Sequence, residues 1–446
     1  MYIKTQKFLI LGISKSGYAV AKYILQNKGI CYLFEELKST KIELALEELH
    51  GLGGIRVSKD EIDKILLHID NLIISPGVPI NHELAIKAKN LGKRIIGELE
   101  FGFLQFTPPI VAVTGTNGKT TTVALIEQIL AEQGEKVLLV GNVGVPITSK
   151  ITDADNDTVC VAEVSSFQLE STHSFCPHVS CILNITPDHL ERHYTMENYI
   201  YLKKRIFKNQ KESEYCVLNY DDNIVRGFAS EIKAKKIYIS LKEKVDGAYF
   251  NEGKLYYFDQ YIMDADKLSL KGKHNIYNCL FAIAVCSLMG AENQVIERAL
   301  QSFKGVKHRM ELIANKEGIT FYNDSKATNT SSTISAIEMI KTPTVLILGG
   351  SEKGEDYSLL FEKIKNSSVK HTVLTGASRF NMLECASRVG LLNLTVTYDF
   401  NTAVKMAKTI AENGDCVLLS PACASFDFFE NFEERGERFR KIVEGF

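Results

Sequence analysis

The residues best suited to do chemistry lie between positions 114 and 120, which read Thr-Gly-Thr-Asn-Gly-Lys-Thr directly after an apolar run. Glycines let a backbone turn tightly so that its N–H groups face a phosphate, Lys119 can reach outer phosphates, and the Thr120 hydroxyl can hold Mg²⁺. A helix-like pattern follows, and its N-terminus would add a positive dipole end. The loop therefore predicts binding of a nucleoside triphosphate. It departs from the general G-x-x-x-x-G-K-S/T spacing, because Val113 stands where that pattern has glycine.

Two more polar positions follow apolar runs of β-branched residues. Glu163 comes after the run at 158–162, and His189 closes the segment Asn-Ile-Thr-Pro-Asp-His at 184–189. A carboxylate at a strand end near a phosphate loop is where the Mg²⁺ of a nucleotide is usually held, which favours a metal role for Glu163 over an ordinary strand end. His189 could be a second metal ligand or a structural histidine, and its position alone does not decide.

Asn275 and Asn278 open a predicted helix and share one of its faces because they are three residues apart. They could contact a base or sugar, or they could cap the helix. Lys203 lies in the run Lys-Lys-Arg at 203–205, which by spacing alone indicates a solvated helix face.

A dense polar cluster, Asn-Asp-Ser-Lys-Ala-Thr-Asn, occupies 323–329 shortly after Arg309. A plain turn needs fewer charges than this cluster has. Arg309 and Lys326 could neutralise a phosphate or a carboxylate, and Asp324 could accept a hydrogen bond from a ribose hydroxyl.

The composition is that of an ordinary globular protein. A chain of 446 residues with 45% hydrophobic and 24% charged residues is expected to form two or three domains. The net charge of −2 gives no electrostatic reason to expect nucleic acid or an acidic membrane as a partner. The ten cysteines form no C-x-x-C pair and lie mostly in apolar runs, none of which approaches the roughly 20 residues of a membrane span. Buried thiols in a reducing compartment, the cytoplasm, are therefore expected.

Short β-branched runs alternate with amphipathic segments, which is typical of α/β domains. The first block ends near residue 97 and has strands at 7–11 and 71–75, with a turn at 12–17 leading into a helix. Ser14 stands where a dinucleotide fingerprint has its second glycine, which disfavours NAD binding. The second block, 98–305, has strands at 158–162 and 179–183, an antiparallel edge within 235–262 and a helix over 274–289.

The third block, 306–446, has the alternation of a doubly wound sheet. Strands are predicted at 344–348, 371–374, 394–397 and 416–419, with helices at 357–365, 380–388, 402–413 and from 433. Ligands bind such sheets beyond the carboxyl ends of the strands, where the segments 349–353 and 420–425 lie.

Taken together, these segments resemble the Mur ligase family over the whole chain. The similar segments are TGTNGKTT at 114–121, EVSSFQLE at 163–170, NITPDH at 184–189, KKRIF at 203–207, GKHNIYN at 272–278, HR at 308–309, NDSKATN at 323–329, LGGSEKGEDYS at 348–358 and SPACASFD at 420–427. The first of these is family-wide, whereas NDSKATN and SPACAS resemble the branch that adds D-glutamate. The resemblance implies an α/β fold of three domains, with a Rossmann-like UDP-binding domain at 1–97, a P-loop ATPase-type domain at 98–305 and a doubly wound amino-acid-binding domain at 306–446.

The resemblance also implies a reaction. ATP would phosphorylate the L-alanine carboxylate of UDP-N-acetylmuramoyl-L-alanine, and the amine of D-glutamate would displace the phosphate to form an amide of a peptidoglycan precursor. A monomer that neither binds nucleic acid nor inserts into a membrane is expected. The family implies ATP contacts at Gly115, Thr116, Asn117, Gly118, Lys119, Thr120, Thr121, Asn275, Asn278, Arg309 and Asp324.

Two Mg²⁺ ions are implied as well, one held by Thr120 and Glu163 and one by His189 together with Lys203 carrying a carbamate. Lys119, His189 and Lys203 are the implied catalytic residues. A carbamate forms only on a neutral amine, so a lysine with an ordinary pKa of ~10.4 must be depressed by its neighbours or trapped by the metal.

The implied substrate contacts fall into three groups. The uridine diphosphate would lie near Ser16, Glu35 and Gly77, and the muramoyl part near Asn142 and Ser165. The positions implied to hold D-glutamate are Lys326, Thr328, Lys353, Ser425 and Phe432. The first domain departs from the family pattern, because Glu35-Glu36 replaces an Asp followed by a hydroxyl residue and Ser14 replaces a common glycine.

Two alternatives remain open at the level of the sequence. A sister ligase could add another amino acid or act on folate, although about 97 residues precede the phosphate-loop block and folylpolyglutamate synthases place their loop nearer the N-terminus. A P-loop regulator that cycles nucleotide without forming a bond is a different class, but the chain has no N-K-x-D guanine signature.

Overall fold

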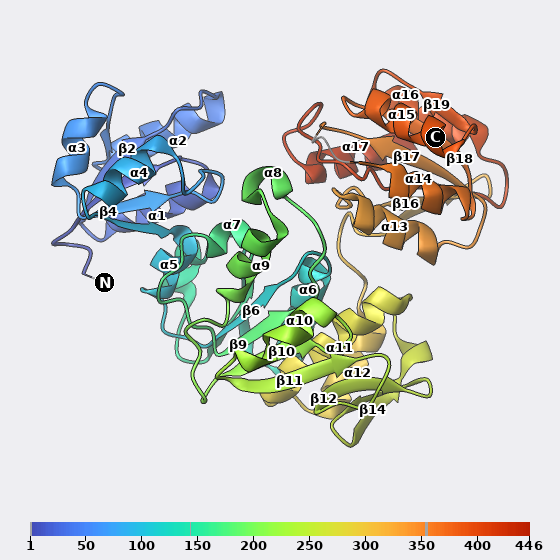
Figure 1. The fold of residues 1–446 in the computed structure, drawn as a ribbon, viewed down its shortest axis with the longest axis horizontal. Coiled ribbons are helices and arrows are strands. Elements are labelled where there is room, and N and C mark those ends of the chain that lie inside the picture. The colour runs from blue at the N-terminus through green and yellow to red at the C-terminus, as the bar shows by residue number, and fades with distance from the viewer. Residues whose placement is uncertain (1, 143, 353–355) are drawn as a thin grey trace. The chain divides into compact units, whose positions relative to one another are not determined.

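The computed structural model describes residues 2–142, 144–352 and 356–446. Contacts divide the chain into two compact units: a first unit of residues up to Ser269 together with Asn275–Phe303, and a second unit of Leu270–His274 and Lys304–Phe446. The first unit contains two sheets and the second contains one (Figure 1). Within the described residues, no helix is long and apolar enough to cross a membrane.

The N-terminal sheet has five parallel strands in the order β3-β2-β1-β4-β5. The strands are short, the central strands β1 and β4 are almost entirely buried, and α1 packs on the sheet by burying Ala19, Val20 and Ile24. The chain runs outward from β1 to β3 and then returns to β4, so the strand order reverses between β1 and β4. The elements are β1 (Lys7–Leu11), α1 (Lys15–Gln26), β2 (Ile30–Phe34), α2 (Thr40–Gly51), β3 (Ile55–Arg56), α3 (Ile62–His68), β4 (Asn71–Ile74), α4 (Glu83–Asn90) and β5 (Arg94–Gly97).

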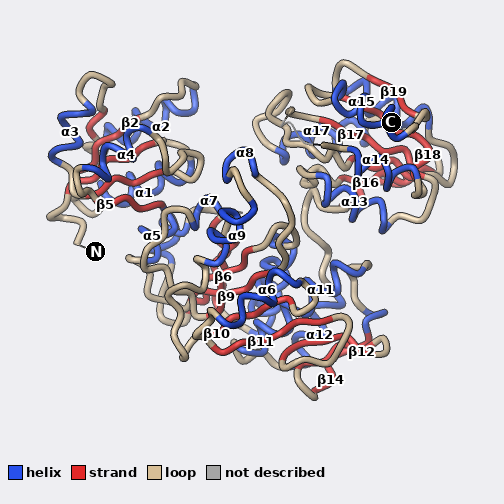
Figure 2. The backbone as a smooth tube through the Cα atoms, viewed as in Figure 1, coloured by secondary structure: helices blue, strands red, loops and turns tan. Residues whose placement is uncertain are grey.

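The central sheet has nine strands in the order β14-β13-β12-β11-β10-β9-β6-β8-β7. Figure 2 draws the strands in red and the helices in blue. Strands β6 to β12 pair in parallel, and only β12, β13 and β14 pair antiparallel. The strands are β6 (Ile110–Thr114), β7 (Lys136–Gly141), β8 (Thr158–Glu163), β9 (Val179–Ile182), β10 (Tyr215–Asn219), β11 (Lys235–Ser240), β12 (Gly247–Asn251), β13 (Lys254–Tyr257) and β14 (Gln260–Asp264). The predicted antiparallel edge is therefore confirmed for β12–β14, but β11 belongs to the parallel part.

The helices of this region are α5 (Glu98–Phe103), α6 (Lys119–Gln133), η1 (Ile147–Asp153), α7 (Ser166–Leu169), α8 (Leu190–His193), α9 (Met196–Lys204), α10 (Asn223–Arg226), η2 (Gly227–Ser230), η3 (Ala265–Lys267), α11 (Lys273–Leu288) and α12 (Asn293–Ser302). Helix α11 is almost entirely apolar after its first turn and is buried along most of its length, as expected for a helix enclosed by other elements.

The second unit has a six-stranded sheet in the order β15-β16-β20-β17-β18-β19, parallel except for β15. The elements are β15 (Glu311–Lys316), β16 (Ile319–Asn323), α13 (Thr330–Met339), β17 (Thr344–Gly349), α14 (Ser358–Lys365), β18 (Val369–Thr375), α15 (Arg379–Val389), β19 (Leu394–Val396), α16 (Phe400–Ile410), β20 (Cys416–Leu419) and α17 (Phe432–Glu444). The α/β class and the doubly wound alternation of this region are confirmed.

One predicted helix is shorter than expected. The pattern extended it to residue 413, whereas α16 ends at Ile410 and Ala411 has extended backbone angles. The side chain of Asp415 accepts the N–H of Glu412 at 2.7 Å, so a local turn takes the donor that a further helical turn would use.

All ten cysteines are free, and nine are buried, with Cys176 partly buried. Burial raises the pKa of the Cys216 thiol to about 12, which keeps it protonated and unreactive. The expected absence of a disulfide framework agrees with these free thiols.

Glu98, the first residue of α5, carries a carboxylate that is completely buried. One oxygen accepts the N–H of Thr148 at 2.8 Å, and the other has no hydrogen-bond partner. Burial raises the pKa of Glu98 to about 7, because an ionised carboxylate loses its hydration there. A glutamate in an unfolded chain has a pKa of about 4.3. The stabilisation from protonated Glu98 is therefore complete below about pH 4 and is lost as the pH rises through about 7.

Replacing Glu98 by glutamine removes this titration and keeps the acceptor for Thr148. We expect the free energy of unfolding of Glu98→Gln, relative to that of the wild type, to increase by about 2–3 kcal/mol between pH 4.5 and pH 8, because only the wild type loses stability over this range. Urea denaturation at the two pH values measures it, with Glu83→Gln on the exposed surface of α4 as the control. A pH-independent difference would show that Glu98 does not titrate in this range.

Candidate active site

The order of the central sheet brings three strand ends together. Strand β6 lies between β8 and β9, with Val113 opposite Glu163 and Thr114 opposite Ile182. Because all three strands are parallel, the segments that follow them leave the same edge of the sheet. The loop at 115–118, Glu163 and the segment at 184–189 are therefore neighbours although they are far apart in sequence.

The loop after β6 has the backbone that its glycines predict. Gly118 has φ +89° as it enters α6, and a Cβ there would lie 2.5 Å from Oδ1 of Asn278. Both the left-handed backbone and the close approach require glycine. The Lys119 ammonium donates to the carbonyls of Gly115 and Thr116 at 2.9 and 2.8 Å, so the lysine lies over the loop.

The predicted metal pair is brought together directly after the loop. The Thr120 hydroxyl donates to Oε2 of Glu163 at 2.7 Å, and the Asn142 amide donates to Oε1 of the same carboxylate at 2.7 Å. Asn142, which the resemblance places near the muramoyl part, therefore also contacts the expected metal ligand Glu163. A hydroxyl and a carboxylate oxygen are the donors that Mg²⁺ prefers, so this pair fits a magnesium site.

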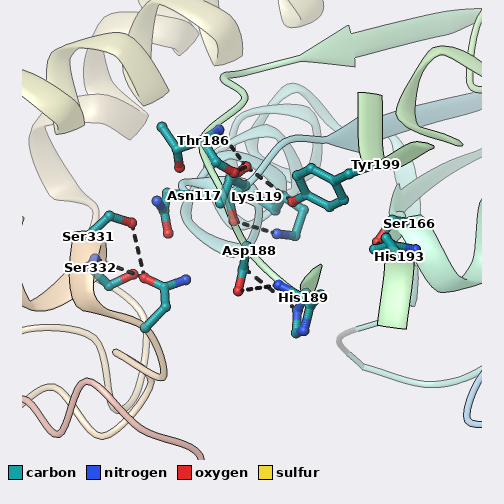
Figure 3. Close-up of polar contacts among 12 residues, drawn as sticks. Asn117, Lys119, Ser166, Thr186, Asp188, His189, His193, Tyr199, Ser331 and Ser332 are labelled. Atoms are coloured by element: carbon teal, nitrogen blue, oxygen red, sulfur yellow. Dashed lines mark hydrogen bonds and ion pairs between the residues drawn. The ribbon is translucent and has the colours of Figure 1, made fainter. Parts of the chain in front are cut away.

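The segment 184–189 is fastened to the loop by Thr116. The Thr116 hydroxyl accepts the N–H of Thr186 at 3.0 Å, donates to its carbonyl at 3.1 Å, and lies 3.1 Å from the Tyr199 hydroxyl. Figure 3 labels these two partners, Thr186 and Tyr199. His189, at the end of this segment, has φ 54° and lies 4.9 Å from the Phe167 ring. Its nitrogens are 3.6 and 3.5 Å from carboxylate oxygens of Asp188 and Glu191.

Lys203 is not on a solvated face, so the interpretation from spacing alone was wrong. It is 2% exposed, and its Nζ donates to the Gly115 carbonyl at 2.8 Å and lies 4.7 Å above the Tyr199 ring. Burial, reinforced by the charge of Lys119, holds the pKa of Lys203 well below its usual value. Charge patterns do not reveal which residue of a basic run turns inward.

The structure describes no cluster of three or more His, Cys, Asp or Glu side chains suited to a metal ion. Thr120 and Glu163 supply part of one hard-oxygen site. A charged ammonium does not bind a metal, so Lys203 would be a metal ligand only with its amine carboxylated.

The two asparagines of α11 bond to each other and to the first helix after the phosphate loop. Asn278 donates to Oδ1 of Asn275 at 3.3 Å and accepts from the Thr122 hydroxyl at 3.3 Å. Both are buried, and Asn278 lies against Gly118. They therefore belong to the surroundings of the phosphate loop.

In the N-terminal sheet, Ser16 and Gly77 follow β1 and β4, on either side of the point where the strand order reverses. Such a point is where ligands bind in open parallel sheets. The Glu35 carboxylate accepts the N–H groups of Ile13 and Leu37 at 2.6 and 2.8 Å, so it connects the segments after β1 and β2. Ser165 forms a capping box with Gln168 at the start of α7, which gives its hydroxyl a structural role.

In the second unit, Asp324 follows β16 and is completely buried. It lies 3.7 Å from Arg309, accepts from the Ser420 hydroxyl at 2.8 Å and accepts the N–H of Met310 at 3.2 Å. Burial raises the pKa of Asp324 to about 6, and Arg309 opposes that rise. Arg309 and Asp324, which the sequence assigned separately to the nucleotide, therefore lie beside each other.

The expected amino-acid site combines two loops of the second unit. Lys326 places its Nζ 4.7 Å above the Phe432 ring, while Ser425 is buried and Thr328 is partly buried. Lys353 lies outside the described residues.

Arg435, which no sequence motif singles out, is 2% exposed. Its guanidinium donates to Oγ and O of Ser325 and to the carbonyls of Cys423 and Ala424, at 2.8–3.1 Å. One arginine on α17 therefore joins the segment that carries Lys326 to the segment that carries Ser425. The sequence does not predict this role, because one arginine in a helix with many charged residues does not differ in pattern from the exposed ones.

The sheets, the phosphate loop and the Thr120–Glu163 pair define an α/β protein that binds nucleotide phosphate. Residues 113–286 match the Mur ligase middle domain, and residues 308–423 match the domain described as "Mur ligase, glutamate ligase domain". The chain belongs to the Mur ligase family.

Relatives in the family are similar over their full lengths. The UDP-N-acetylmuramoylalanine–D-glutamate ligase of Caldanaerobacter subterraneus subsp. tengcongensis is 40% identical over 447 residues, and that of Clostridioides difficile is 41% identical over 449, with 99% of each chain covered. The crystal structure of MurF ligase from Thermotoga maritima in complex with ADP has a TM-score of 0.62 at 17% identity, covering 100% of this chain and 99% of that one. At that identity the structural likeness supports the fold alone.

Proposed function

We propose that this chain is an ATP-dependent ligase that joins D-glutamate to UDP-N-acetylmuramoyl-L-alanine in peptidoglycan precursor synthesis. Full-length identity of about 40% to ligases with that name supports the substrates. The observation that carries the activity is the bond of the Thr120 hydroxyl to Glu163 directly beneath the phosphate loop. We propose domain boundaries at 1–97, 98–305 and 306–446, which correspond to the three sheets.

The chemistry requires activation of a carboxylate, which is a poor electrophile. A carboxylate oxygen forms a bond to the γ-phosphorus of ATP, and the bond from that phosphorus to ADP breaks. The amine nitrogen of D-glutamate then bonds to the acyl carbon, the carbon–oxygen bond to phosphate breaks, and the nitrogen loses a proton. The products are ADP, phosphate and an amide.

Residues of the phosphate loop would bind the triphosphate and orient its γ-phosphate. Lys119 lies over the loop and supplies a positive charge next to the transferred group. We assign Gly118, Thr120 and Thr121 to the same phosphates. Gly115, Thr116 and Asn117 form the turn of the ATP-binding loop that precedes them, and Asn275 and Asn278 support the loop. In the second unit, Arg309 and Asp324 are assigned to nucleotide phosphate and ribose.

Thr120 and Glu163 would hold one Mg²⁺, and His189 with carboxylated Lys203 would hold the second. Bound there, the ions would neutralise the charge of two approaching anions. Carboxylation means that the neutral amine of Lys203 bonds to the carbon of CO₂ and releases a proton. The lowered pKa of Lys203 supports this step because it increases the neutral fraction.

The remaining substrate positions are proposed from the family pattern. Ser16, Glu35 and Gly77 are assigned to uridine diphosphate, Asn142 and Ser165 to the muramoyl part, and Lys326, Thr328, Lys353, Ser425 and Phe432 to D-glutamate. Ten free cysteines suit a reducing compartment, so we place the protein in the cytoplasm, and we propose that it acts as a monomer.

Phosphate release from ATP with UDP-N-acetylmuramoyl-L-alanine tests the proposal. We expect release with D-glutamate and not with L-glutamate, L-alanine or L-lysine, together with the matching amide product. Release with another amino acid would keep the family and overturn the substrate. Release without any acceptor would favour a protein that only cycles nucleotide.

Lys326→Ala is the specificity control for this assay. Loss of the charge beside Phe432 should raise the KM for D-glutamate about 10-fold or more and leave the Kd of ATP unchanged, since a hydrogen bond to a charged group contributes roughly 1.5–3 kcal/mol. If only ATP binding falls, the assignment of Lys326 is wrong.

A further inference from the structure

The loops that follow β6 and β9 continue to pair beyond the ends of the strands. The N–H of Leu183 donates to the Thr114 carbonyl at 3.0 Å, and the N–H of Thr116 donates to the Asn184 carbonyl at 2.9 Å. Beyond this point the two segments make no further backbone–backbone hydrogen bonds to each other within the described residues. Asn184 is the residue at which side-chain contacts replace these bonds.

The Asn184 side chain pairs with the backbone of a single residue. Its Oδ1 accepts the N–H of Asn117 at 2.9 Å, and its Nδ2 donates to the carbonyl of Asn117 at 3.0 Å. The amide therefore acts as a peptide group would in a neighbouring strand. The donor and the acceptor of Asn117 together fix which way the amide is turned. An alanine would remove both bonds, and an aspartate would lack the donor.

This contact determines which loop groups can bind phosphate. The N–H groups of Thr116 and Asn117 are both directed to Asn184, so they do not belong to the phosphate cradle. The cradle must then begin at Gly118, whose left-handed backbone directly follows the residue held by Asn184, and continue into the first turn of α6. Expectations from the loop sequence alone do not make this distinction.

We propose that Asn184 is a positioning residue that holds the phosphate loop in its binding conformation before nucleotide arrives. A loop that is already ordered does not lose conformational freedom on binding, so the affinity for nucleotide rises. The same residue begins the segment that carries His189, so one side chain sets the loop relative to that segment. The inference rests on nucleotide binding at this loop, as proposed above.

The chain offers a matched control in Asn219, a buried asparagine at the end of β10. Its Nδ2 donates to the carbonyl of Leu183 at 2.9 Å, and its Oδ1 accepts the N–H of Asp221 at 3.1 Å. It supports Leu183, the residue before Asn184, and among the described residues its side chain makes no hydrogen bond to the phosphate loop. Asn219→Ala therefore removes a buried amide of equal size without releasing Asn117.

Calorimetric titration with Mg·ADP and amide hydrogen exchange of the nucleotide-free protein test the inference. We expect Asn184→Ala to weaken Mg·ADP binding about 10-fold or more, the equivalent of two neutral hydrogen bonds, and to speed exchange over residues 114–122. We expect Asn219→Ala to lower the melting temperature without changing the Kd. In the wild type, the Asn117 amide should exchange as slowly as the amides of β6, and this measurement needs no variant.

Equal Mg·ADP affinity of Asn184→Ala and wild type would overturn the inference and leave the proposed function intact. Rapid exchange of the Asn117 amide in the wild type would overturn it as well, as would equal loss of affinity in both alanine variants. Failure of the wild type to bind Mg·ADP would overturn the proposed function and the inference together.

Discussion

Replacing Lys203 by alanine is expected to lower kcat by about 10²–10³-fold, the size of effect seen when one electrostatic contact to a developing charge is removed. The substitution deletes the amine whose carbamate would provide the anionic ligand beside His189. It also removes the donor to the Gly115 carbonyl, but that carbonyl keeps its bond from Lys119. The measurement is steady-state phosphate release at saturating substrates.

If Lys203 acts as a carbamate, the alanine variant should also be rescued by small carboxylates. Small carboxylates such as acetate should enter the vacated space and partly restore kcat, because they supply the missing oxygen ligand. Lys204→Ala, at the next position and paired on the surface with Glu231, should retain wild-type activity. Absence of rescue, together with a wild type that is indifferent to carbon dioxide, would refute the carbamate.

The second large effect is expected at Arg435. Arg435→Ala should lower the free energy of unfolding of the second unit by about 3–5 kcal/mol, because buried acceptors lose their charged hydrogen-bond donor. Burial lowers the pKa of Arg435 only to about 10, so the side chain is charged at neutral pH. The acceptors left behind belong to Ser325, Cys423 and Ala424.

Arg438, one turn further along α17, is the control. It is exposed and donates to Asn401 at 2.8 Å, so Arg438→Ala should change stability by less than about 0.5 kcal/mol. Urea denaturation of the full chain gives both values. A stability loss in Arg435→Ala no larger than that of Arg438→Ala would mean that the guanidinium does not join the two loops.

Much of the fold could be predicted because the strands that carry motifs are continuous apolar runs. Strands β6, β8 and β9 end where their runs end, and each is followed by a polar group at the edge of the sheet. The glycines of the loop also predict its backbone conformation, because Gly118 adopts the left-handed conformation that its position before α6 requires. Local sequence thus determines both the elements and the positions of their polar ends.

The contacts that the sequence did not reveal are those between side chains far apart in the chain. The bond from Asn142 to Glu163 was not foreseen, because Asn142 was considered only as a contact of the muramoyl part. Lys203 was assigned to solvent on spacing alone, because a helix whose basic residues are consecutive gives no sign of which one turns inward. Strands β10 and β15 were also missed, and their runs are short and carry polar residues.

The position of β6 in the centre of its sheet has a consequence for how the protein forms. Its neighbours are β8 and β9, and neither is next to it in the chain. Parallel pairing of distant segments is slow because the loop between them must close first. During synthesis on a ribosome, β6 can pair with its second neighbour, β9, only after the chain as far as Ile182 has left the ribosome. The phosphate loop, although encoded in one short stretch, is therefore completed late in folding.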